Sequence, residues 1–104
     1  MNKCELIAEI GWNHMGDMSL AEKMISEASK AGVDFCKFQT WKVKNLKEGP
    51  WNKDGRLEIY NKAELTDENH KTLIILCKKY KVKFLTSVFN VKDLDFISKL
   101  SNHA

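Results

Sequence analysis

The chain has 104 residues, of which 43% are hydrophobic and 30% are charged, with 5 Gly and 1 Pro, a composition typical of one small globular domain or part of one. Its 17 Lys and Arg and 14 Asp and Glu are interleaved and leave a net charge of +3, so we do not expect a nucleic-acid-binding protein. The apolar run near the N-terminus is short and contains Glu5 and Glu9, so neither a signal peptide nor a membrane span is expected.

The cysteines also limit the class of protein. Cys4, Cys36 and Cys77 are odd in number and lie far apart in the sequence. This spacing matches no zinc or redox motif, and a disulfide framework is not expected. A cytoplasmic protein fits best.

The first predicted unit is a strand followed by a helix. An apolar run without helical spacing comes first, and apolar residues at the helical period follow it: Leu6, Ile7, Ala8 and Ile10, then Ala21, Met24, Ile25 and Ala28. Ser19 and Glu22 form an S-x-x-E capping box, which predicts that Ser19 caps the helix. Gly32 predicts a left-handed end to it.

A polar loop separates this strand from the helix. Gly11 and Gly16 flank it, and we expect them to supply backbone freedom or close approach. Asn13 is expected to bond its own backbone, as Asn does in turns. His14 has two interpretations, a metal ligand or base, and a residue that shapes the loop by bonding backbone; we favour the second.

A second strand is predicted over VDFCKFQT, residues 33–40. Phe35, Lys37 and Gln39 fall on one face of it, and Asp34, Cys36 and Phe38 fall on the other. The segment from Trp41 to Leu65 has few periodic signals and contains Trp51 and several basic residues, including Lys47. We interpret it as a lid over an anionic substrate, with a solvated loop as the alternative.

Two further helices enclose a third strand. Thr66 is predicted to cap a helix from about residue 67 to 80, with an apolar stripe at Leu73, Leu76, Cys77 and Tyr80. VKFLTS, residues 82–87, predicts the third strand. Asn90 is predicted to cap a last helix with an apolar stripe at Leu94, Ile97 and Leu100.

This alternation predicts an α/β protein with three βα units and parallel strands. In such sheets, ligands gather at the carboxyl ends of the strands. The polar residues there are Glu9 on the first strand, Lys37 and Gln39 on the second, and Thr86 and Ser87 on the third. We therefore expect one polar rim built from three strand ends.

Two stretches carry a resemblance to a known family. IAEIGWNHMGDMSLAEKMISEASKAGVDFCKFQT resembles the first βα unit and second strand of the sialic acid synthase (N-acetylneuraminate synthase) family, and IYNKAELTDENHKTLIILCKKYKVKFLTSVFN resembles its next helix and third strand. The resemblance implies the first three βα units of a (β/α)8 TIM barrel, a fold of about 250 residues. Residues 1–104 would then be an N-terminal fragment of the catalytic barrel, without the C-terminal half-barrel and the antifreeze-like domain.

The resemblance also implies an activity. The family condenses phosphoenolpyruvate with N-acetylmannosamine or a related amino sugar and releases phosphate. The product is a nine-carbon 2-keto acid of the N-acetylneuraminate, legionaminate or pseudaminate type, as in lipopolysaccharide or capsule biosynthesis. The family uses manganese or magnesium, but its metal ligands lie on later strands, so none is expected in this chain. A full-length form would be a homodimer, and the fragment alone is expected to be inactive.

Matching positions give the candidate catalytic residues. Glu9 matches a carboxylate that orients the sugar, and Lys37 matches a lysine that pairs with phosphoenolpyruvate. A lysine in a mostly apolar strand costs stability without an anionic partner, which favours a functional Lys37. Gln39 would orient substrate or hold Lys37.

Further substrate contacts are expected elsewhere. Thr86 and Ser87 stand where the family usually has S-T-P-F and this chain has T-S-V-F. Asp54 falls near a position that contacts the sugar. The alternative to an enzyme is a small α/β module that binds a partner or assembles with copies of itself; three parallel strands alone would leave unpaired edges and an exposed apolar face.

Overall fold

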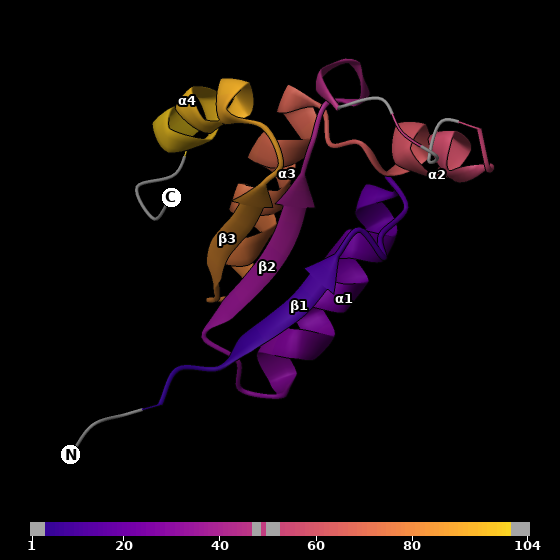
Figure 1. Ribbon diagram of the computed structural model, residues 1–104. Helices are drawn as coiled ribbons and strands as arrows, with labels where there is room; N and C mark the ends of the chain where they lie inside the picture. Colours follow the sequence, from indigo (N-terminus) through magenta and orange to yellow (C-terminus); the bar gives the residue numbers. More distant parts are fainter. Residues whose placement is uncertain (1–3, 47–48, 50–52, 101–104) are drawn as a thin grey trace.

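The computed structural model describes residues 4–46, 49 and 53–100. Strands and helices alternate as predicted, and Figure 1 shows their arrangement. In chain order the elements are β1 (Ile7–Gly11), α1 (Met18–Lys30), β2 (Phe35–Thr40), the 3-10 turn η1 (Val43–Asn45), α2 (Arg56–Ala63), α3 (Asp67–Lys79), β3 (Lys83–Val88) and α4 (Val91–Leu100).

The three strands form one parallel sheet in the order β1-β2-β3. Helices α1 and α3 lie behind the sheet in Figure 1, and no helix is drawn in front of it. The sheet therefore has one face packed on helices and, among the described residues, one open face. Because parallel strands end at the same edge, all three carboxyl ends meet near α2 and α4.

The core fills the space between the sheet and α1 and α3. Its buried members are Ile10, Ala21, Ile25, Cys36, Phe38, Leu65, Leu73, Cys77, Val82 and Phe84. The rings of Phe38 and Phe84 stack across β2 and β3, with centroids 5.7 Å apart. Burial alternates along β2, so the predicted division of its residues between two faces is confirmed.

The predicted capping box of the first helix is wrong. Asp17 caps α1, and its Oδ1 accepts hydrogen bonds from the backbone N–H groups of Ser19 (2.9 Å) and Leu20 (3.2 Å). An Asp at this position caps a helix as well as Ser does, so the helix begins before Ser19. Glu22 instead accepts hydrogen bonds from the Lys79 ammonium and the Tyr80 hydroxyl, which joins α1 to α3. The left-handed end at Gly32 is confirmed by its φ of +90°.

Two later caps are confirmed. The Thr66 hydroxyl accepts from the Asn69 N–H at 3.0 Å at the start of α3, and Asn90 Oδ1 accepts from the Lys92 N–H at 2.9 Å at the start of α4. The predicted stripe of α4 is wrong at Leu94, which is 51% exposed. The adjacent residue Asp93 is buried instead, because its side chain turns toward η1, where the Asn45 amide donates to its Oδ1. The side chain of Leu100 lies outside the described residues.

The segment between β2 and α3 contains structure that the sequence did not predict. It includes η1 and the two-turn helix α2. Helix α2 has only Ala63 buried and is held by Trp41, whose indole N–H donates to the Tyr60 carbonyl at 3.0 Å. An aromatic anchor leaves no apolar period in the sequence, which is why the helix was missed. Lys47 and Trp51 lie outside the described residues.

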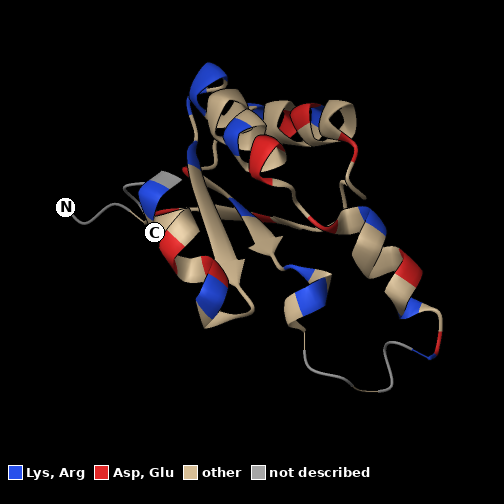
Figure 2. Cartoon of the chain, turned by 90° about the horizontal axis from the view of Figure 1, so that it is seen from above, with Lys and Arg blue, Asp and Glu red and all other residues tan. Residues whose placement is uncertain are grey.

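Charged residues of both signs are distributed over the surface of the helices. Figure 2 shows Lys and Arg interspersed with Asp and Glu over the helices. In the part of the chain that the structure describes, no helix has both the length and the apolar character that crossing a membrane requires.

Candidate functional site

Four of the predicted site residues lie on the open face of the sheet. Glu9 and Lys37 are register partners on β1 and β2, and Lys37 Nζ lies 3.3 Å from Glu9 Oε1. Gln39 follows two residues after Lys37 on the same face. Ser87 is the register partner of Gln39 on β3 and so lies on this face as well. We call Glu9, Lys37, Gln39 and Ser87 the open-face cluster.

The end of β1 is shaped to leave room beside this cluster. The β1–β2 register shifts between Glu9 and Gly11, which is the mark of a bulge. Gly11 has a φ of +59°, and a Cβ there would lie 3.6 Å from Gln39 Nε2 and 3.9 Å from Glu9 Oε2. Glycine thus lets the chain turn away while the Glu9 carboxylate and the Gln39 amide stay close together.

The Lys37–Glu9 pair is open to solvent. The Lys37 side chain is 32% exposed and the Glu9 side chain is 51% exposed. Exposed ion pairs of this kind contribute at most about 1 kcal/mol, so exchanging one partner has a small effect on stability. An anionic ligand can therefore replace Glu9 as the partner of Lys37.

Thr86 does not join the open-face cluster. It pairs in register with the buried Phe38 and faces the helices. Its hydroxyl lies 2.8 Å from the Thr40 hydroxyl, which lies 2.9 Å from His70 Nε2. The expectation that both hydroxyls of T-S-V-F reach one rim is wrong for Thr86, because adjacent residues of a strand point to opposite faces.

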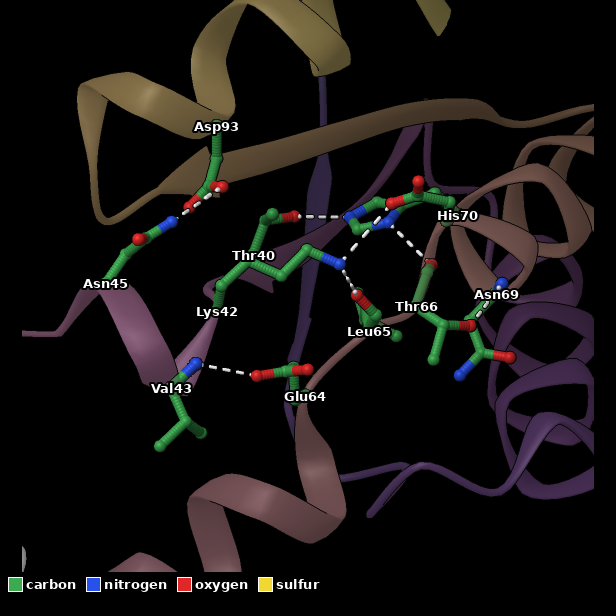
Figure 3. A network of polar contacts seen from close by, with 11 residues as sticks. Thr40, Lys42, Val43, Asn45, Glu64, Leu65, Thr66, Asn69, His70 and Asp93 are labelled. Carbon is green, nitrogen blue, oxygen red and sulfur yellow. Dashed lines mark hydrogen bonds and ion pairs between the residues drawn. The ribbon is translucent and has the colours of Figure 1, made fainter.

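His70 is a buried polar residue that the sequence analysis did not single out. Its Nδ1 lies 2.9 Å from the Thr66 carbonyl oxygen, and its Nε2 contacts Thr40 (Figure 3). Burial lowers the pKa of His70, and the Thr66 carbonyl opposes this effect. A His within the first turns of an amphipathic helix is the only sequence signal, and it does not reveal the contact with Thr40.

A second set of polar contacts joins the segments beyond the strand ends (Figure 3). Lys42 Nζ donates to the Leu65 carbonyl at 3.3 Å and pairs with Asp67 at 3.3 Å. The Val43 N–H donates to Glu64 Oε1 at 2.6 Å. An open depression of about 590 Å³ lies here, lined by Lys42, Val43, Lys44, Asn61, Glu64 and Asp67.

The polar loop after β1 is held by its own residues and by α2. His14 is buried, and its Nδ1 accepts from the Gly16 N–H at 2.9 Å, a contact of the kind expected of a loop-shaping residue. Burial lowers the pKa of His14, and the Gly11 carbonyl opposes this. A Cβ on Gly16 would collide with the Lys62 carbonyl oxygen at the end of α2. Asn13 is exposed, and its backbone N–H donates to the Ile10 carbonyl.

Asp54 lies just before α2 and binds Arg56. The guanidinium donates to both carboxylate oxygens, with Arg56 Nη2 2.7 Å from Asp54 Oδ2. This guanidinium lowers the pKa of the Asp54 carboxyl. The structure gives Asp54 no contact with the open-face cluster among the described residues.

The described residues do not fit a manganese or magnesium site. No group of three or more His, Cys, Asp or Glu side chains is placed to hold a metal ion within residues 4–46, 49 and 53–100. Glu9 is paired with Lys37, and the buried His14 ring turns its Nδ1 to the Gly16 N–H.

Comparisons with known proteins agree with this fold. The NeuB family model matches residues 24–104. The chain is 38% identical to N,N'-diacetyllegionaminic acid synthase of Campylobacter jejuni, in a match that covers 96% of this chain and 33% of the relative. It is 30% identical to pseudaminic acid synthase of Helicobacter pylori, with coverage of 93% and 32%.

A solved structure is similar as well. The N-acetylneuraminic acid (sialic acid) synthetase of Leptospira borgpetersenii, in complex with citrate, matches with a TM-score of 0.79 and 26% identity over 96% of this chain and 34% of that one. The prediction of three βα units from the N-terminal part of such a barrel is confirmed. The chain spans about a third of the length of these relatives. Because the family model matches most of its residues, the chain belongs to the NeuB family.

Proposed function

We propose that this chain supplies the N-terminal part of the active site of a cytoplasmic, phosphoenolpyruvate-dependent sugar acid synthase. The enzyme would join phosphoenolpyruvate to an N-acetylated amino sugar and release phosphate, and would act as a homodimer. The observation that carries the proposal is the open-face cluster, which places a lysine, a carboxylate and an amide at the carboxyl ends of parallel strands. The names of the similar synthases support the reaction class.

The chemistry assigns a role to each residue. In the reaction, C3 of phosphoenolpyruvate bonds to the sugar aldehyde carbon, water adds at C2, and phosphate leaves. Phosphoenolpyruvate is an anion, and the Lys37 ammonium is the cation of the cluster, so Lys37 binds its carboxylate or phosphate. Glu9 then accepts hydrogen bonds from sugar hydroxyls, and Gln39 orients either substrate.

The contact between Lys37 and Glu9 predicts the order of these events. Without substrate the two side chains satisfy each other at 3.3 Å. When phosphoenolpyruvate binds Lys37, it displaces the Glu9 carboxylate, which can then bind the sugar. Binding of the anion first therefore prepares the site for the second substrate.

Ser87 and Asp54 are two further substrate contacts in the proposal. The Ser87 hydroxyl would donate to phosphoenolpyruvate, and the register pairing of Ser87 with Gln39 supports this role. Asp54 remains a predicted sugar contact, and to act it must exchange Arg56 for a hydroxyl group. Since this pair is exposed, the exchange requires little free energy.

Titration of the chain with phosphoenolpyruvate, followed by backbone amide shifts, tests the anion site. Lys37→Met removes a charged hydrogen-bond donor and should weaken binding about ten- to a hundredfold. Glu9→Gln removes the competitor for Lys37 and should leave affinity equal or higher. Lys83→Met is the matched control, because Lys83 lies on the same face at the amino end of β3 and contacts Phe35. Equal affinities of the Lys37→Met and Lys83→Met variants would contradict the proposal.

A further inference from the structure

A series of buried and half-buried hydrogen bonds runs behind the open-face cluster, on the helix side of the sheet. It leads from the Thr66 carbonyl through His70 to Thr40, with atom separations of 2.9 and 2.9 Å (Figure 3). From the Thr40 hydroxyl it continues to the Thr86 hydroxyl, 2.8 Å away. His70 and Thr40 are 0% and 1% exposed. This series of hydrogen bonds ends at the Ser87 carbonyl oxygen, 3.3 Å from the Thr86 hydroxyl.

The direction of these hydrogen bonds follows from the groups themselves. The Thr66 carbonyl can only accept, so His70 Nδ1 must carry a proton. In a neutral imidazole Nε2 is then an acceptor, and the Thr40 hydroxyl must donate to it. Because the single proton of Thr40 is engaged there, the Thr86 hydroxyl donates to Thr40. With His70 neutral, both hydroxyl protons point toward the ring and none remains for the Ser87 carbonyl.

Protonation of His70 leaves the Nδ1–H bond to the Thr66 carbonyl unchanged and reverses the direction of the hydrogen bonds beyond Nε2. Nε2 becomes a donor to Thr40, the Thr40 hydroxyl then donates to Thr86, and Thr86 donates to the Ser87 carbonyl. Thr40 directly follows Gln39, and Thr86 directly precedes Ser87. The series of hydrogen bonds therefore links β2 and β3 at Thr40 and Thr86. Each of these two residues is adjacent in sequence to a member of the open-face cluster.

We infer that His70, acting through Thr40 and Thr86, is a positioning residue that sets where Gln39 and Ser87 meet phosphoenolpyruvate. The inference rests on the proposed function for its substrate. His70 touches no substrate in this arrangement, and its effect reaches the open face only through the two hydroxyl groups.

The surroundings of His70 favour the neutral ring. Burial and the Lys42 charge lower its pKa from the ordinary value of 6.5, while the Thr66 carbonyl, Asp67 and Asp93 oppose them, and burial is the largest effect. The edge of the ring packs against Phe96, with centroids 5.8 Å apart. At neutral pH the hydroxyl protons accordingly point toward His70, and acid is needed to reverse them.

An NMR titration of the chain tests the coupling without any substrate. The His70 ring nitrogens and the Ser87 carbonyl carbon are followed from about pH 8 to about pH 4, a range that spans the ordinary histidine pKa. In the unaltered chain the Ser87 carbonyl shift should follow the His70 titration. Thr86→Val leaves the Thr40–His70 bond in place but breaks the path, so His70 should titrate as before while Ser87 no longer follows. Thr86→Ser should restore the coupling.

Thr40 provides the second pair of variants. Thr40→Val leaves Nε2 without its donor, so the amide spectrum is first checked for an unchanged fold, and Thr40→Ser retains the hydroxyl. Phosphoenolpyruvate should bind about three- to tenfold more weakly to Thr40→Val and within about twofold of normal to Thr40→Ser.

The outcomes separate the inference from the proposed function. The inference is overturned if the Ser87 carbonyl shift in the unaltered chain does not change with the His70 titration. It is also overturned if this shift follows the titration equally in Thr86→Val. Both results hold independently of phosphoenolpyruvate binding. Unchanged phosphoenolpyruvate affinity in both Thr40→Val and Thr86→Val also overturns it. A chain that shows the coupling but binds no phosphoenolpyruvate supports the positioning of Gln39 and Ser87 and contradicts the proposed function.

Discussion

At the scale of single residues, Gly16 shows how the loop after β1 depends on close backbone approach. Its φ is +78°, and a side chain there would meet the Lys62 carbonyl oxygen of α2. The loop that follows Glu9 and the end of α2 can touch only because position 16 has no Cβ. This contact fixes the loop beside the open-face cluster.

Gly16→Ala should therefore destabilise the chain by more than the conformational penalty alone. Gly32→Ala is the matched control, since Gly32 also has a positive φ, +90°, but a Cβ at that position would have no neighbour within 4 Å among the described residues. We expect Gly32→Ala to cost about 1 kcal/mol and Gly16→Ala at least about 2 kcal/mol of unfolding free energy. Urea denaturation of both variants gives the comparison, and equal costs would show that the contact with Lys62 is unimportant.

The sequence predicted the candidate site in part. Glu9, Lys37 and Gln39 lie together because strand alternation and parallel register are fixed by the apolar pattern. Thr86 was misplaced because it was grouped with its neighbour by motif, although the period of a strand separates them. His70 was missed because a contact between a helix and a strand end depends on packing, which no local pattern records.

At the scale of elements, the start of α1 shows how tertiary contacts decide between two candidate N-caps. Asp17 and Ser19 both have side chains suited to an N-cap, and the sequence motif favoured Ser19. The structure uses Asp17, and Glu22, the partner expected of Ser19, bonds to Lys79 and Tyr80 of the neighbouring helical segment. A tertiary contact thus replaces the local one.

Substitution of each candidate cap distinguishes the two. Asp17→Ala removes the acceptor of two backbone N–H groups and should cost about 1 kcal/mol of unfolding free energy. Ser19→Ala lies within the helix and should change it by less than about 0.5 kcal/mol. Thermal or urea unfolding measures both, and a larger loss for Ser19→Ala would restore the capping box.

The fold was more predictable than the connections. Strands and long helices were found because their apolar residues recur at periods of 2 and 3.6. Helix α2 was not, because Trp41 holds it through a backbone carbonyl and a ring contact with Tyr60, at 5.8 Å between centroids. Leu94 was wrongly assigned to the core because Asp93, bonded to Asn45, occupies the inner side of α4 there.

At the scale of the whole molecule, the open face of the sheet is the feature that needs explanation. It carries Ile7, which is about half exposed, together with the open-face cluster, and the described residues place no helix over it. The alternative to an enzyme was a small α/β module that binds a partner or assembles with copies of itself. The face has a paired lysine and carboxylate at the carboxyl ends of its strands, which an apolar interface does not need.

The family relationship gives this face a simpler role. In a barrel, the face of the sheet opposite the helices lines the interior, and its carboxyl end forms the active site. The similar synthases are about three times as long as this chain, so they hold further segments that can complete such an interior. Under the proposed function, the open face would form part of the wall of a substrate site.

The most direct measurement is phosphate release by a chimera in which residues 1–104 replace the matching third of the Campylobacter jejuni relative. Assayed with phosphoenolpyruvate and an N-acetylated amino sugar, it should release phosphate only when both are present. Lys37→Met should lower kcat/KM at least about a hundredfold, and Lys83→Met should leave it within about twofold. A Lys37→Met chimera as active as the unaltered one would contradict the assignment of the open-face cluster as the phosphoenolpyruvate site.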